Sequence, residues 1–345
     1  MNSPQALEIN LWGYCALFLL CAVCFYMLEV KVVKKCWIIF ILCLSLLLSA
    51  CSGGQSASVS GNTVDFTDAL GREVSVEKNP ERVAALIGSF ADVWQLSGGT
   101  LCAAAEDAWE DFGLTLDGAV NIGGAHSPSL ELLLSADPEL VLASASTASN
   151  VEMKDTLEAA GITVIYFDVD NFDDYLHMLN ICTDLTGRKD LYEQNGLKLQ
   201  TQIEAIKTEY ANCGASDKER TVLLLRAASS FVKAKGSSGT ILGEMLADMG
   251  CINIADSNTS LLENLSVEAI VREEPYHIFV VTMGNDTEAA QTSLKNLMKE
   301  NPAWSELEAV KEGRLHMMEK TLFNLKPNAR WAEAYQRLYE TLTEE

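Results

Sequence analysis

Three basic residues stand close together in an otherwise acidic sequence. The chain of 345 residues has a formal net charge of −23 at pH 7, yet Arg226 follows a predicted strand at 221–225, and Lys233 and Lys235 come shortly after it. Cations that gather in one place on an acidic protein can bind the anionic groups of a small ligand. Ordinary solvated loop residues are the alternative, and the sequence leaves both interpretations open.

Two aromatic residues lie in similar positions. Trp109 follows a predicted strand at 101–105, and Phe323 follows the last predicted strand. An aromatic ring at the edge of a cleft can cover the apolar face of a ligand, whereas a ring packed inside the protein is the alternative. The candidate ligand-binding residues are therefore Trp109, Arg226, Lys233 and Phe323.

No enzyme or metal motif accompanies these residues. The sequence has no Gly-x-Ser-x-Gly elbow, no His-Glu-x-x-His pair and no phosphate loop with Gly-Lys-Ser/Thr. The histidines are isolated along the chain, which argues against a receptor for free zinc or manganese; they are His126, His177, His277 and His316. We predict a protein that is not an enzyme, with no catalytic residues, no bound metal and no cofactor.

Short apolar strands that alternate with helical patterns must position the candidates. After an opening hairpin at 64–76, strands are predicted at 83–87, 101–105, 140–143, 163–167, 221–225, 251–254, 278–281 and 314–318. Such alternation predicts an α/β fold with mostly parallel sheets. Ligands bind beyond the carboxyl ends of the strands in these sheets, which is where the candidates lie.

A repeat divides the chain into two similar parts. Each copy reads as a Ser-capped helix that stops before a proline and is followed by a buried strand. This repeat predicts two similar lobes with a binding cleft between them, although such units also recur by chance in α/β proteins. A separation of 137 residues relates Ser129 to Ser266, Glu131 to Glu268 and Pro138 to Pro275.

A polar segment with apolar residues at helical spacing lies between the two halves. It predicts one long helix that connects the lobes. We therefore place the N-terminal lobe at 63–187, the connecting helix at 188–213 and the C-terminal lobe at 214–345.

The N-terminus has the features of a leader. An apolar run at 36–50 ends in Leu48-Ser49-Ala50-Cys51, which resembles the signal of bacterial lipoproteins, whose cysteine is lipidated and becomes the new N-terminus. A plain secretory signal or a membrane anchor is the alternative. We predict a leader at 1–50, a lipid on Cys51, a flexible tether within 51–62, and a location at the extracytoplasmic face of the cell membrane.

Charge and cysteine spacing exclude other classes. A net charge of −23 rules against a nucleic-acid partner, because phosphates need a basic face. The cysteines beyond the leader and Cys51 have no Cys-x-x-Cys spacing, so neither a zinc site nor a disulfide framework is indicated.

Several short motifs, taken in order, resemble the iron-siderophore, haem and cobalamin family of ABC-transporter substrate-binding lipoproteins, which have the class III periplasmic-binding-protein fold. The resemblance spans residues 64–342 and implies two Rossmann-like α/β lobes joined by one long helix, with a cleft between them. It also implies a small metal complex as ligand and a permease dimer with a cytoplasmic ATPase as partner. The motifs are Asp68–Glu73, Asn79–Val83, Ser129–Glu131, Asp137–Val141, Ala160–Val164, Asn301–Trp304, Lys311–Leu315 and Lys326–Arg330.

The resemblance assigns a role to the repeated glutamates. In this family a Glu on each lobe docks onto arginines of the permease dimer, and Glu131 and Glu268 are the matching positions; an ordinary first-turn Glu is the alternative. Siderophore sites of the family combine aromatics with Arg or Lys, cobalamin sites are mainly aromatic, and haem sites supply an iron ligand. We expect a ferric siderophore, with cobalamin or haem, or a ligand sensor without transport, as alternatives.

Overall fold

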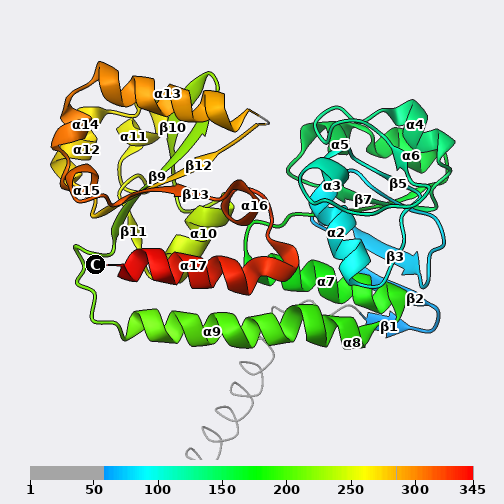
Figure 1. Ribbon diagram of the computed structural model, residues 1–345. Coiled ribbons are helices and arrows are strands. Elements are labelled where there is room, and N and C mark those ends of the chain that lie inside the picture. Colours follow the sequence, from blue (N-terminus) through cyan, green and yellow to red (C-terminus); the bar gives the residue numbers. More distant parts are fainter. Residues whose placement is uncertain (1–57, 285, 345) are drawn as a thin grey trace, which may run out of the picture. The chain divides into compact units, whose positions relative to one another are not determined.

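The computed structural model describes residues 58–284 and 286–344 (Figure 1). The chain divides into two compact units, Met1–Ser56 and Ala57–Glu345, and the description below concerns the second. The predicted leader, the predicted lipid site Cys51 and the first part of the predicted tether lie outside the described residues. None of the described helices is both long enough and apolar enough to cross a membrane.

The N-terminal lobe contains a parallel sheet with the strand order β6-β5-β4-β7-β8. Apolar side chains are buried on both of its faces: Ala85 and Leu142 belong to one cluster, and Ala84 and Val141 belong to another. The strands are β4 (Val83–Ala85), β5 (Ala103–Ala104), β6 (Val120–Asn121), β7 (Leu140–Ser144) and β8 (Thr163–Phe167). The helices of this lobe are α2 (Gly88–Leu96), α3 (Asp107–Glu110), α4 (Leu130–Ser135), α5 (Ala148–Glu152) and α6 (Lys154–Ala159).

The C-terminal lobe repeats this topology. Its strands β11-β9-β12-β13 are parallel and follow the same order as β5-β4-β7-β8, and β10 adds an antiparallel strand beside β9. The two-lobed α/β fold predicted from the repeat is therefore confirmed. The strands are β9 (Thr221–Ala228), β10 (Phe231–Lys235), β11 (Ile252–Asn253), β12 (His277–Thr282) and β13 (Leu315–Met318). The helices are α10 (Ile241–Asp248), α11 (Thr259–Asn264), α12 (Val267–Glu273), α13 (Thr287–Glu300), α14 (Ala303–Glu306), α15 (Glu308–Lys311), α16 (Lys320–Phe323), a 3₁₀ turn (Asn328–Arg330) and α17 (Trp331–Thr343).

Three strands were not predicted from the sequence: β1 (Ser58–Ser60), β6 and β10. β10 places Lys233 and Lys235 on a strand rather than in a loop. β1 pairs with β2 (Thr63–Thr67), which pairs with β3 (Glu73–Glu77), so the prediction of a flexible tether is wrong from Ser58 onward. Each of these short strands lies at the edge of its sheet.

A long helical segment connects the lobes and lies beside α17 (Figure 1). The helix before it, α7 (Phe172–Thr186), has the bounds that the sequence predicts, because an Asn171–Asp174 capping box begins it and Gly187, with a φ of 69°, ends it. The connecting segment consists of α8 (Lys189–Tyr192), a π-helical turn (Glu193–Leu197) and α9 (Lys198–Ala211).

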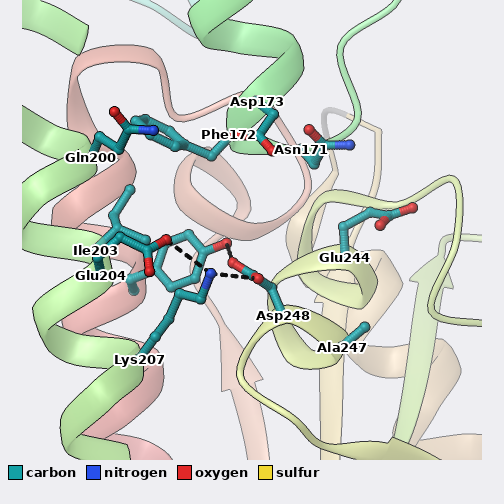
Figure 2. Close-up of a pocket in the computed structure, with 11 residues that line it drawn as sticks. Asn171, Phe172, Asp173, Gln200, Ile203, Glu204, Lys207, Glu244, Ala247 and Asp248 are labelled. Atoms are coloured by element: carbon teal, nitrogen blue, oxygen red, sulfur yellow. Dashed lines mark hydrogen bonds and ion pairs between the residues drawn. The ribbon is translucent and has the colours of Figure 1, made fainter. Parts of the chain in front are cut away.

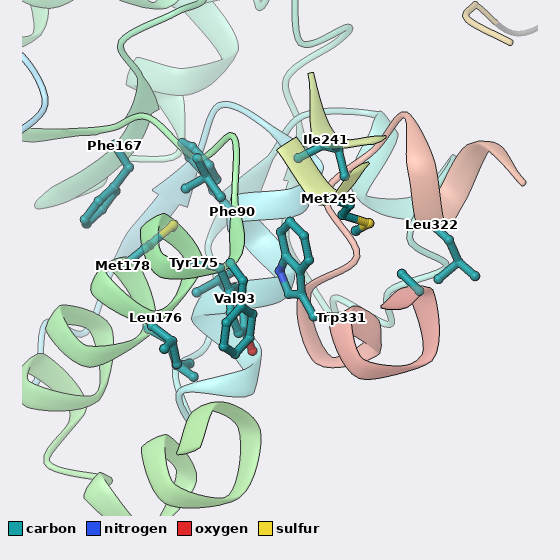
Figure 3. Packing of buried hydrophobic residues seen from close by; sticks show 14 of the residues in the cluster. Phe90, Val93, Phe167, Tyr175, Leu176, Met178, Ile241, Met245, Leu322 and Trp331 are labelled. Carbon is teal, nitrogen blue, oxygen red and sulfur yellow. The ribbon is translucent and has the colours of Figure 1, made fainter. Parts of the chain in front are cut away.

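The largest apolar cluster belongs to both lobes. It includes Phe90 of α2, Tyr175 of α7, Met245 of α10 and Trp331 of α17 (Figure 3). The Trp331 side chain is fully buried, and its ring centroid lies 5.8 Å from that of Phe172. One apolar core therefore serves both lobes and the helices between them.

Candidate functional site

The predicted basic residues form one patch at the carboxyl end of β9. Arg226 of β9 lies directly opposite Lys233 of the antiparallel strand β10, and Lys235 is two residues further along β10. Directly opposite residues share a face of the sheet, as do residues two apart on one strand. The three cations therefore lie on one face of the β9–β10 ribbon, and we call them the cation patch.

No carboxylate of the described residues forms an ion pair with the cation patch. The Nε atom of Arg226 is buried and has no hydrogen-bond partner among the described residues. Burial lowers the pKa of Arg226. Burial, and then the charges of Arg226 and Lys233, also lower the pKa of Lys235. The patch is thus a set of uncompensated positive charges, suited to an anionic ligand.

The other two candidates lie in different surroundings. Phe323 is 2% exposed and belongs to the shared core, so its ring offers no face to a ligand in this structure. Trp109 is partly buried and packs against the same core. An ion pair brings their segments together, since Lys320 Nζ lies 2.7 Å from Asp111 Oδ1. The structure thus joins Arg226 with Lys233, whereas Phe323 belongs to the shared core and Trp109 packs against it.

A second group of polar residues lies near the lobe junction, in part on segments that follow predicted strands. The Gly88 amide donates to Asp107 Oδ2 at 2.9 Å. The other oxygen of Asp107 and the hydroxyl of Ser89 are buried with no partner in the described chain. Lys326 Nζ lies 5.9 Å from the centroid of the Phe90 ring. Ser89 and Asp107 each follow a predicted strand, which is where ligands bind in such sheets. Lys326 does not directly follow a predicted strand and begins the motif Lys326–Arg330.

Charge distinguishes this second group. Burial raises the pKa of Asp107. Burial lowers the pKa of Lys326, and the carboxylates of Asp170, Asp168 and Asp107 oppose that shift. A lysine from the C-terminal lobe therefore faces carboxylates of the N-terminal lobe without a close ion pair among the described residues.

A cavity of about 300 Å³ is lined by other residues, none of them from the cation patch (Figure 2). It is bounded by the start of α7 and by α9, α10 and α17, and several carboxylates line it. Lys207 Nζ lies 2.7 Å from Asp248 Oδ1, Tyr335 donates to the other oxygen of Asp248 at 2.7 Å, and Glu204 accepts from Lys207 at 3.0 Å. Because Lys207 already pairs with Glu204 and Asp248, and further carboxylates line the cavity, it is a poor match to an anionic ligand.

The histidines are not all isolated in space. His277 Nδ1 lies 3.0 Å from His316 Nε2 because β12 and β13 are parallel neighbours. This pair lies at the start of β12, opposite the end that carries the cation patch. No group of three or more His, Cys, Asp or Glu side chains in the described ranges is placed to hold a metal ion. The described cysteines Cys102, Cys182, Cys213 and Cys251 are free thiols.

The repeated glutamates occupy equivalent places. Glu131 and Glu268 are exposed, and each is the second residue of a helix whose N-cap serine accepts a hydrogen bond at 3.3 Å: Ser129 from Leu132, and Ser266 from Ala269. Neither carboxylate forms an ion pair with a cation in the part of the chain that the structure describes.

Comparison with known proteins agrees with this fold. A family model for periplasmic binding proteins matches residues 83–322. The chain is 26% identical over 286 residues to the Fe(3+)-citrate-binding protein YfmC of Bacillus subtilis (strain 168), which covers 79% of this chain and 84% of that protein. It is 23% identical over 316 residues to the putative ABC transporter substrate-binding lipoprotein YhfQ of the same organism, with 87% and 95% covered.

A solved structure shows the same architecture. S. aureus IsdE complexed with heme superposes with a TM-score of 0.63 at 18% identity, covering 76% of this chain and 99% of that one. The family match spans both lobes and well over half of the chain. This chain belongs to the periplasmic binding protein family.

Proposed function

We propose that the protein is the extracytoplasmic substrate-binding lipoprotein of an ABC importer and that it captures an anionic iron complex, a ferric siderophore or ferric carboxylate chelate. The cation patch carries this proposal: Arg226, Lys233 and Lys235 gather on one face without a described carboxylate partner, in a chain of net charge −23. The buried, unpartnered Nε of Arg226 would gain a charge-assisted hydrogen bond from such a ligand. The similarity to an Fe(3+)-citrate-binding protein supports the same ligand class.

Delivery and anchoring complete the proposal. Glu131 and Glu268 form ion pairs with basic residues of a permease dimer, one from each lobe. Their exposure and their equivalent positions support this role. A lipid on Cys51 holds the protein at the extracytoplasmic face of the cell membrane, in line with the lipoprotein name of a relative. The bound complex is cargo that the permease receives, with ATP hydrolysis in the cytoplasm as the source of energy.

Fluorescence titration of the detergent-solubilised full chain tests the ligand. Ferric citrate, haemin and cyanocobalamin are added in parallel while tryptophan emission is followed. We expect ferric citrate to bind and the K233Q/K235Q variant to bind it roughly 10²- to 10⁴-fold more weakly, since each of the two lost charge-assisted hydrogen bonds contributes about 1.5–3 kcal/mol. The control K311Q removes a lysine that pairs with Glu306 outside the patch.

The possible outcomes separate the ligand classes. Equal affinity of K233Q/K235Q and K311Q would remove the cation patch from the binding site. Binding of haemin or cyanocobalamin without ferric citrate would replace the proposed ligand. Failure of all three compounds to bind would refute an iron-complex or corrinoid receptor.

A further inference from the structure

Two exposed aliphatic side chains recur at equivalent places in the two lobes. Leu134 of α4 is 37% exposed and Val271 of α12 is 44% exposed. They are separated by the same 137 residues that separate Glu131 from Glu268. Single exposed apolar residues are common on proteins and need no explanation. Recurrence at matching positions of two lobes is a different observation, and it calls for a common cause.

The aliphatic residue and the glutamate share one face of each helix. Leu134 follows Glu131 by three residues, and Val271 follows Glu268 by three, so both pairs are neighbours on the helix surface. The residue just before each aliphatic position, Leu133 or Ile270, is fully buried. Each helix therefore packs one side against its lobe and presents a carboxylate beside an aliphatic group on the other.

The ends of both helices are also fixed in the same way. Asp137 and Glu274 directly precede Pro138 and Pro275, the prolines of the repeat. Both residues have a left-handed backbone, with φ of 48° and 46°. A cation that precedes the first strand of each lobe's main sheet bonds to this end: Arg82 donates to the carbonyl of Asp137 at 2.7 Å, and Lys218 donates to the carbonyl of Glu274. Each helix is thus tied to the central strand of its own lobe, and its outward face is held rigidly.

We propose that each lobe docks through a two-part epitope, Glu131 with Leu134 on one lobe and Glu268 with Val271 on the other, in which the aliphatic side chain is an anchor in its own right. The partner is a protein with two equivalent binding sites, each with a basic residue beside an apolar pocket. Two matching epitopes fit a two-fold symmetric dimer, and two carboxylates without an ion-pair partner among the described residues favour basic residues on it. The inference rests on the proposed function, in which that dimer is the permease.

Photo-crosslinking in membranes tests the epitope without reference to the ligand. The full chain is produced with p-benzoylphenylalanine in place of Leu134, of Val271 or, as a control, of the exposed Leu197 on the connecting segment. We expect positions 134 and 271 to crosslink to the same polytopic permease polypeptide, and position 197 to give no such product. Absence of this product at either 134 or 271 overturns the inference.

An iron-uptake assay distinguishes the role of the aliphatic residues in docking from the role of the glutamates. Cells producing the full chain are supplied with ⁵⁵Fe-citrate, and three double variants are compared: L134S/V271S, E131Q/E268Q and the control L197S/I252S, which removes exposed apolar residues elsewhere. We expect L134S/V271S to lower uptake at least fivefold while its affinity for ferric citrate stays at the wild-type value. Wild-type uptake by L134S/V271S, with uptake lost in E131Q/E268Q, overturns the anchor role and leaves charge docking intact. If the wild-type chain itself fails to bind ferric citrate, the proposed ligand is wrong, and the crosslinks alone decide the inference.

Discussion

Lys320 and Asp111 form an ion pair of 2.7 Å between the two lobes, although 209 residues separate them in the chain. Lys320 begins α16, and Asp111 directly follows α3. Both side chains are mostly buried, with 19% and 25% exposed. The pair therefore ties the segment that contains Trp109 to the segment that follows the last strand of the C-terminal lobe.

Removal of this bridge is expected to loosen the lobe junction. K320Q should lower the free energy of unfolding in urea by about 1 kcal/mol, because the pair is better shielded from water than a surface ion pair. Amide hydrogen exchange should become faster in α16 and after α3. The matched control K311Q breaks an exposed pair within one lobe and should cost less than about 0.5 kcal/mol. Equal stability of the two variants would show that the bridge contributes nothing.

The Arg226 side chain is expected to lower the free energy of unfolding of the unliganded protein. Its buried Nε has no described partner, and such an orphan donor costs about 1–3 kcal/mol. R226M keeps the aliphatic stem, so it should raise the free energy of unfolding by about 1 kcal/mol while weakening ferric citrate binding. Urea unfolding and the fluorescence titration measure the two effects. A variant that is less stable than the wild type would instead identify Arg226 as a structural residue.

The His277–His316 pair predicts a loss of stability in mild acid. Burial, and then the charges of His316 and Arg314, lower the pKa of His277 to about 4, while Glu219 opposes the shift. Unfolded histidine titrates near 6.5, so between pH 6.5 and 4 the unfolded chain binds a proton that the folded chain does not. Stability from this group is complete above pH 6.5 and falls, by at most about 1.4 kcal/mol per pH unit, as the pH drops through that window.

Urea unfolding at pH 7 and pH 5 measures this dependence. The double variant H277L/H316L should show a shallower decrease between the two pH values than the wild type. The control H126Q changes an exposed histidine and should keep the wild-type decrease. If H277L/H316L retains the full decrease, carboxylates elsewhere account for the acid sensitivity.

Gly196 is expected to set how closely the connecting segment approaches α7. A Cβ at this position would lie 2.9 Å from Leu176 Cδ2 and 3.3 Å from Leu179 Cδ2. G196A should be nearly neutral, because the gain in helix propensity of about 1 kcal/mol offsets a small shift of two flexible leucine ends. G196V overfills the contact and should cost about 1–3 kcal/mol.

An exposed position on the same connecting segment provides the control for this effect. Q202V introduces the same β-branched side chain at an exposed site of α9, so it reports helix propensity without the packing contact. Thermal and urea unfolding of the three variants should rank G196V as the least stable. Similar losses in G196V and Q202V would attribute the effect to propensity alone.

Local signals in the sequence determined much of this architecture. The bounds of α7, α12 and α13 follow from N-cap residues, apolar spacing and chain-stopping residues that act within a few positions of one another. The 137-residue repeat likewise predicted both lobes, because equivalent helices and strands carry equivalent local patterns.

Only the tertiary structure decided which side chains meet. It placed Lys233 on β10 opposite Arg226, buried Phe323 in the shared core, and joined Lys320 to Asp111 across the lobe junction. Each of these outcomes depends on strand pairing or on packing between distant segments. The residues of one segment alone do not specify which other segment it will contact. The sequence therefore determined the helices and strands and their order. Long-range packing determined the cation patch, because Arg226, Lys233 and Lys235 lie on one face only when β9 pairs with β10.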